Sequence, residues 1–153
     1  MSKSDETLDR IELTNAYKEQ INPSFSHGKL INAFDTETSD GDVFMLSYAI
    51  GDMSGVIGNE SVEALDSSEI FDKITNRQCR SALNCWYNLD FDANALLSGI
   101  LDRRELTELT ITNGTTTKVD GIEYEIRYVK SKFLRIRDSN KNIYAHYDVS
   151  QFF

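Results

Sequence analysis

Two acidic side chains stand at the end of an apolar segment that begins at Leu30, "LINAFDTET", where Asp35 and Glu37 are separated by one residue. If this segment is a β-strand, residues two apart point to the same face of the sheet. Two carboxylates that close together cannot both stay ionised without cost unless a cation lies between them. Oxygen ligands favour Mg²⁺ or Mn²⁺ over zinc. The alternative is a solvated strand end followed by a turn.

A second polar group follows another apolar segment, in "WYNLDFDANALL", which contains Asn88 and Asp92. We expect this to be the point where a buried strand gives way to a helix. Open α/β sheets bind their ligands beyond the carboxyl ends of the strands, and the helix dipole favours a carboxylate in the first turn. The alternative is that Asp90 or Asp92 is simply the N-cap of the helix.

The elements that must position these side chains follow from the hydrophobic periodicity and the turn residues. The expected elements are strands at 29–36 and 43–50 joined by the tight turn "SDGD", a third strand around Val56 and Ile57, a helix from Ser67 or Ser68 to about Asn76, a strand at 81–88, and a helix over "DFDANALLSGILDRRE" with Arg103 and Arg104 at its C-terminal end. The first hundred residues therefore predict the order β-β-β-α-β-α.

The pattern changes from Thr107 onward, where "GIEYEIRYV", "KFLRIRD" and "NIYAHYDV" alternate between apolar and polar residues. With "KS" and "SNKN" as connections, these segments predict an antiparallel β-meander. Residues 1–28 are polar with weak helical periodicity and predict a helical extension. The predicted fold class is α/β, a mixed sheet flanked by helices, with the β-meander at the C-terminal end.

Composition limits the function classes. The chain has 153 residues, enough for one domain, and a net charge of −9, which disfavours nonspecific binding to duplex DNA. No apolar run approaches the length that crosses a bilayer, so no membrane partner is expected. The polar start of the chain does not match a secretory signal, which makes the cytoplasm the expected location. Cys79 and Cys85 match no zinc pattern and are expected to be reduced and partly buried.

Two motifs give the chain a resemblance to a known family. "FDTET" and "YNLDFD" resemble the first and second motifs of the DEDD-type 3′–5′ exonucleases, which have the ribonuclease-H-like fold. The closest similarity is to the proofreading exonuclease domain of family B DNA polymerases. "KFLRIRD" and "IYAHYDVSQFF" look like the segment that follows in archaeal or viral relatives. The resemblance spans about residues 29–153 and includes a β-hairpin-rich segment at 107–149.

The resemblance implies a site. Asp35, Glu37 and Asp92 match the catalytic, metal-binding carboxylates, which would hold two Mg²⁺ or Mn²⁺ ions at the scissile phosphate. Thr36 and Asn88 match residues that approach the substrate strand. We expect the three carboxylates to converge closely enough to share the metals.

Aromatic side chains near this site could stack on unpaired terminal bases. The candidates are Phe44, Trp86 and Phe91, each of which could instead belong to the hydrophobic core. Phe91 is included among the expected substrate-binding residues.

The family's third motif contains a Tyr or His followed by a fourth Asp. Tyr144 and Asp148 have that spacing, but in a strand they would lie ~13 Å apart. We therefore expect the domain to stop before the third motif. The expected function is a metal-dependent 3′–5′ exonuclease, a hydrolase acting on single-stranded or frayed DNA 3′ ends in DNA replication. The alternatives are a catalytically incomplete binding or accessory module of a polymerase or replication complex and, less favoured, a ribonuclease-H-type endonuclease.

Overall fold

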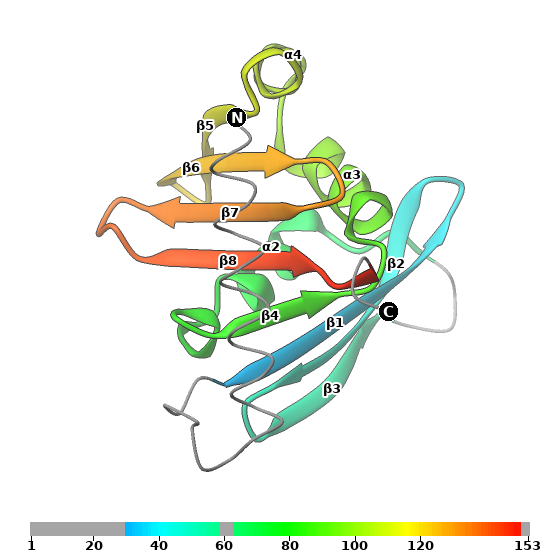
Figure 1. Ribbon diagram of the computed structural model, residues 1–153. Helices are drawn as coiled ribbons and strands as arrows, with labels where there is room; N and C mark the ends of the chain where they lie inside the picture. Colours follow the sequence, from blue (N-terminus) through cyan, green and yellow to red (C-terminus); the bar gives the residue numbers. More distant parts are fainter. Residues whose placement is uncertain (1–29, 59–62, 151–153) are drawn as a thin grey trace.

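The computed structural model describes residues 30–58 and 63–150, which form one mixed eight-stranded sheet with helices (Figure 1). The strand order is β3-β2-β1-β4-β8-β7-β6-β5. The elements in chain order are β1 Ile31–Ser39, β2 Asp42–Ile50, β3 Met53–Gly58, α2 Ser67–Ile74, the 3₁₀ turn η2 Arg77–Cys79, β4 Leu83–Trp86, α3 Leu89–Ile100, α4 Arg103–Thr112, β5 Gly114–Val119, β6 Ile122–Val129, β7 Phe133–Asp138 and β8 Ile143–Asp148. This confirms the α/β class and the predicted β-β-β-α-β-α order. The expected extension at 1–28 lies outside the described residues.

The antiparallel hairpin of β1 and β2 is confirmed. Its two-residue turn is Asp40-Gly41, and both residues have positive φ, the geometry that suits an Asp-Gly hairpin turn. The pairing of β1 with β2 shifts register between Glu37 and Thr38, so a β-bulge follows the predicted acidic pair. Gly58 on β3 packs against this bulge, where a Cβ atom would lie 2.3 Å from the carbonyl oxygen of Phe44. β-bulges bend a strand and re-aim its side chains.

The main hydrophobic core lies on the sheet face that α2 and α3 cover (Figure 1). Residues alternate along β1, with Asn32, Phe34 and Thr36 buried and their neighbours exposed as far as Glu37. Phe34 stacks on Trp86 of β4 with ring centroids 5.0 Å apart. Leu46, Ile70 and Ile74 are among the fully buried apolar side chains of this layer. Because only one face of β1 is buried, buried and exposed residues alternate along the strand.

Helix caps place the helices differently from the predicted bounds. The N-cap of α2 is Asp66, whose carboxylate accepts the backbone N–H of Ser68, rather than Ser67 or Ser68. The long helix predicted after Asn88 is two helices, because Asp102 and Glu105 form a capping box that begins α4. Arg103 and Arg104 therefore lie at the N-terminus of α4, and the prediction that they end a helix is wrong.

The meander has four strands, one more than predicted, because the segment "GTTTKV" forms β5 at the sheet edge beside α4. The predicted two-residue "KS" turn is a three-residue connection, 130–132, in which Ser131 has a positive φ. β5 to β8 extend the main sheet rather than forming a separate layer.

Both cysteines are free, Cys79 buried and Cys85 half-buried. Within the described ranges, no helix is both long and apolar enough to cross a membrane.

Two buried asparagines join the parallel strands at the centre of the sheet. Asn32 of β1 donates to Asn84 Oδ1 on β4 at 2.9 Å and to the Gln78 carbonyl at 3.1 Å, while its own oxygen accepts the Gly51 N–H at 2.9 Å. Asn84 donates at 2.9 Å to the carbonyls of Cys79 and Ala145. Every polar atom of both amides has a partner, so their burial costs little and fixes one alignment of β1, β4 and β8.

Asn84→Ala is expected to lower the free energy of unfolding by about 3 kcal/mol, because it leaves Asn32 and two buried carbonyls short of partners. Urea unfolding measures the change. Asn94→Ala on the exposed side of α3 is the control and should stay within about 0.5 kcal/mol of the parent. Equal effects of the two substitutions would contradict the role given to the Asn32–Asn84 pair.

Candidate functional site

The parallel strands β4 and β8 end at Trp86 and Asp148, level with Phe34 of β1, which continues to Ser39 paired with β2. Phe34 of β1 is paired with Trp86 of β4, and Trp86 is paired with Asp148 of β8. The residues that follow these positions therefore meet at one edge, as the sequence predicted for the segments after Phe34 and Trp86. In an open α/β sheet this is the edge where ligands bind.

Asp35 and Glu37 occupy the last part of β1 on the same face of the sheet, which confirms the expected i, i+2 arrangement. Both residues are exposed, on the face opposite to α2 and α3. Thr36 lies between them, is buried, and points to the helix-covered face. Any substrate contact at position 36 would therefore use the backbone, because the hydroxyl is directed inward.

Asp92 lies in the first turn of α3 and is 5% exposed. Its Oδ1 accepts a short hydrogen bond from the Thr36 hydroxyl. Burial raises the pKa of the Asp92 carboxyl to about 6, and the negative charges of Asp35 and Asp148 add to this pKa rise, while the bond from Thr36 opposes it. A desolvated carboxylate held near two others is a group that a proton or a cation would stabilise.

Neither Asp90 nor Asp92 caps α3, so the alternative that one of them is the N-cap is wrong. The N-cap is Asn88, which adopts a left-handed conformation and makes no side-chain capping bond. Asp90 instead accepts hydrogen bonds from the Tyr128 hydroxyl at 2.5 Å and from the Ser131 N–H and hydroxyl at 2.6 Å. Although partial burial opposes it, these bonds and the charge of Lys130 hold the pKa of Asp90 below its usual value.

The expected cluster of three metal-binding carboxylates is not formed. Among the described residues, no group of three or more His, Cys, Asp or Glu side chains is placed to hold one metal ion. The reason is the alternation of β1, which sends Asp35 and Glu37 to one face and Thr36, the partner of Asp92, to the other. Asp92 thus approaches β1 from the helix-covered face, where it contacts Thr36, while Asp35 and Glu37 lie on the other face.

Asp148 belongs to this edge, although it is not among the site residues expected from the sequence. It is 3% exposed at the end of β8, and its Oδ1 accepts the Ser150 N–H at 2.9 Å and the Ser150 hydroxyl at 2.6 Å. Tyr144, four residues earlier on the same strand, bonds with Asp138 and Arg80 instead. The prediction that Tyr144 and Asp148 do not act as a pair is confirmed, because both lie on one extended strand. Only the strand order brings Asp148 to the site.

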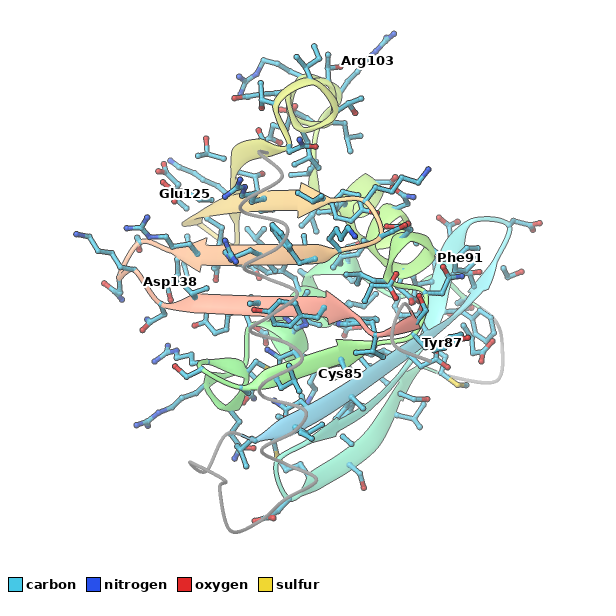
Figure 2. All side chains as sticks on the ribbon, in the orientation of Figure 1. Cys85, Tyr87, Phe91, Arg103, Glu125 and Asp138 are labelled. Atoms are coloured by element: carbon cyan, nitrogen blue, oxygen red, sulfur yellow. The ribbon has the colours of Figure 1, made fainter. Side chains whose placement is uncertain are left out.

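Two exposed aromatic side chains flank Asn88. Tyr87 is 67% exposed and Phe91 is 57% exposed, and Figure 2 shows both at the same end of the molecule. Of the predicted stacking candidates, Trp86 belongs to the hydrophobic core, the alternative given for it, because it is buried against Phe34 with its indole N–H bonded to His146. Phe44 is half-buried. The sequence signal for Tyr87 was its position directly after the buried strand.

No protein-family model matches the chain, and neither a curated protein nor a solved structure matches it.

Asp92→Asn is expected to stabilise the metal-free protein at pH 7.5, by roughly 2 kcal/mol, since each pKa unit corresponds to about 1.4 kcal/mol. The folded pKa of about 6 lies above the usual value of 3.8, so ionisation opposes folding at neutral pH. The gain should shrink as the pH falls from 6 to about 4, where the carboxyl is protonated. Thermal unfolding in EDTA across this pH range measures it.

Asp90→Asn, two residues earlier on the same helix turn, is the matched control. It should destabilise the protein at pH 7.5, because Ser131 and Tyr128 lose a charged acceptor. If both substitutions lower the melting temperature equally, the destabilising effect assigned to the ionised Asp92 carboxylate is wrong.

Proposed function

We propose that this chain is a proofreading-type 3′–5′ exonuclease domain with a ribonuclease-H-like sheet, related to family B DNA polymerases. The substrate is a single-stranded or frayed DNA 3′ end. The observation that carries the proposal is the position of the Asp92 carboxyl beside three neighbouring parallel strands, where burial raises its pKa and the charges of Asp35 and Asp148 add to the rise.

The sheet supports the proposal because it brings the two motifs to neighbouring parallel strands. β1 is internal to the sheet, with its antiparallel partner β2 on one side and the parallel strand β4 on the other. The acidic pair closes β1, and the helix that follows β4 begins at Asn88. Acidic residues from distant parts of the sequence thus lie near one another, close enough for Asp35 and Asp148 to raise the pKa of Asp92.

The chain's own side chains have distinct roles in this proposal. Tyr87 and Phe91 are exposed beside the acidic edge, where unpaired terminal bases can stack on them. Asn88 is exposed and is not used as a side-chain cap, so its amide can bond the sugar or phosphate of the strand. Thr36 holds Asp92 in place through its hydroxyl.

The chemical type of the donors fits a hard divalent cation, because all of them are carboxylate oxygens. The carboxylate of Asp92 is also desolvated by burial. Asp35 and Glu37 would hold the metal from their face of β1, and Asp92 would have to move toward them to contribute, because the three do not form a group around one ion among the described residues. Bound Mg²⁺ or Mn²⁺ would generate hydroxide at neutral pH and stabilise the leaving oxygen.

The protein is expected to shorten a 5′-labelled single-stranded DNA oligonucleotide from its 3′ end when Mn²⁺ is present. Asp35→Asn and Asp92→Asn should each reduce the rate by at least roughly 100-fold, through loss of a metal ligand. Gel analysis of product lengths measures this. Asp52→Asn, in the exposed turn after β2 at the far end from the site, is the control.

Activity that survives both Asp35→Asn and Asp92→Asn would refute the assignment. Because Asp92→Asn is expected to stabilise the fold, its loss of activity could not be attributed to unfolding. Cleavage of circular single-stranded DNA would indicate an endonuclease instead.

One observation favours the second candidate, a catalytically incomplete binding module of a polymerase or replication complex. In the described part of the chain the acids do not form a metal-holding group. Such a module would keep the fold and the exposed aromatic side chains but would not bind metal tightly or turn over.

Mn²⁺ binding separates the two candidates. If the exonuclease proposal is right, Mn²⁺ raises the melting temperature, with a gain of about 2.7 kcal/mol at a metal concentration 100 times Kd. Glu37→Gln should abolish the gain and Asp52→Asn should keep it. A melting temperature that does not respond to Mn²⁺ would favour the binding module.

A further inference from the structure

The sheet face opposite to α2 and α3 carries a second buried cluster. Phe133 is paired in register with Tyr147 and with Val129, so their side chains share this face. The cluster, here called the second-face cluster, consists of Leu83 on β4, Tyr147 on β8, Phe133 on β7 and Val129 on β6. All four side chains are at most 9% exposed. They cross four neighbouring strands, which is about 14 Å at ~4.8 Å per strand.

Neighbouring side chains in the sheet do not account for this burial. Leu83 is 3% exposed, yet its partner on β1 is Ile31, which is itself 42% exposed. On the β8 side, the register places the small side chain of Ala145 beside it. Side chains on one face of a sheet stand next to one another, perpendicular to the sheet, and leave their ends open. A further layer of the molecule must therefore cover the cluster.

The described part of the chain supplies no such layer. Figure 1 shows α2 and α3 on the far side of the sheet, and α4 packs against the edge strand β5. Residues 59–62 follow β3, which two strands separate from β4, and 151–153 are only three residues. Residues 1–29 remain, and they are long enough, because ten helical residues span about 15 Å.

The described chain begins directly beside the cluster. The carbonyl of Leu30 accepts the backbone N–H of Leu83 at 2.8 Å. The segment that precedes Leu30 therefore joins the sheet next to a member of the second-face cluster and needs no long connection to reach it.

Two arginines beside the cluster require an acidic neighbour. Arg127 and Arg135 are paired directly across β6 and β7, and like charges in that position repel each other. Both lie over the Phe133 ring, and both already take part in interactions, so this face is an occupied interface. Residues 1–20 contain five Asp and Glu against three Lys and Arg, and so can supply the acidic partners.

The same segment contains apolar side chains at helical spacing. Leu13, Tyr17 and Ile21 are four residues apart, which places them on one side of a helix. Over eight residues this apolar stripe extends about 12 Å, close to the width of the second-face cluster.

We infer that residues 1–29 pack across the second face of the sheet as a helical cover, with the apolar stripe against the second-face cluster. The cover leaves β1 open, since Ala33 and Asp35 on the same face are exposed. It therefore borders the face that carries the acidic pair on its β4 side. The inference does not depend on the proposed nuclease activity.

Cys85 can report on the cover, because it lies on this face, two residues from Leu83 and paired with Tyr147. Burial raises the pKa of its thiol to about 11. A thiol at the usual pKa of about 8.5 has more than roughly 100 times as much reactive thiolate at pH 8. Cys79, fully buried in the main core, is the internal reference.

The test compares two double variants of the full chain that change the net charge equally. Leu13→Asp with Tyr17→Asp places two charges on the apolar stripe. Ser4→Asp with Asn15→Asp places two charges on the other side of the same helix. Each protein is treated with iodoacetamide at pH 8, and mass spectrometry of peptides follows the alkylation of each cysteine.

The stripe variant should accelerate alkylation of Cys85 by at least about 10-fold, because the uncovered thiol regains its ordinary pKa, while Cys79 stays unreactive. The control variant should keep the parent rate within about 2-fold. If Cys79 also becomes reactive in the stripe variant, the milder Tyr17→Ser takes its place and should accelerate Cys85 alone.

A Cys85 rate equal to the parent's in these stripe variants would overturn the inference, and so would equal acceleration in the control variant. Sedimentation of the parent distinguishes a second copy of the chain as the cover. A dimer whose Cys85 becomes reactive on dilution would show that the partner, and not residues 1–29, covers this face.

Discussion

The hydrogen bonds between Asn32 and Asn84 are the constraint on which the rest of the structure depends. They join β1 to β4 in a buried layer, and Asn84 reaches β8 through the Ala145 carbonyl. A one-residue slip in a strand would move every side chain to the opposite face. The fixed register therefore decides that Asp35 stays exposed and that β4 and β8 end level with Phe34 of β1. The position of the acidic edge is a consequence of two uncharged amides in the core.

Local charge, rather than net charge, determines what this molecule can bind. Asp90 is stabilised as an anion by Ser131 and Tyr128, whereas Asp92 is desolvated and placed near other carboxylates. The first holds the start of α3 against the β6–β7 connection, and the second retains an unfavourable charge that a cation would relieve. The β6–β7 hairpin, in which residues 126–137 include five Lys or Arg and no acid, lies beside Asp90. An overall charge of −9 hides this separation of acidic and basic surfaces.

The sequence by itself determined most of the fold. The alternation from Ile31 to Glu37 gave the strand and the shared face of the acidic pair, because side-chain direction in a strand has a period of two. Asp40-Gly41 specified the hairpin turn through its tolerance of positive φ. The capping box at Asp102 was also present in the sequence, and overlooking it joined two helices into one. These features depend on residues that are neighbours in the chain.

Only the tertiary structure decided which carboxylates meet. Asp90 and Asp92 lie two apart in the same helix turn, and nothing local distinguishes the one that bonds Ser131 from the one that bonds Thr36. Asp148 reaches the site because β8 inserts between β4 and β7, although it lies 56 positions after Asp92 in the sequence. Burial, and with it the pKa of Asp92, comes from packing between segments far apart in the chain. No local pattern encodes such partners, because sheet pairing and desolvation are set by the whole fold.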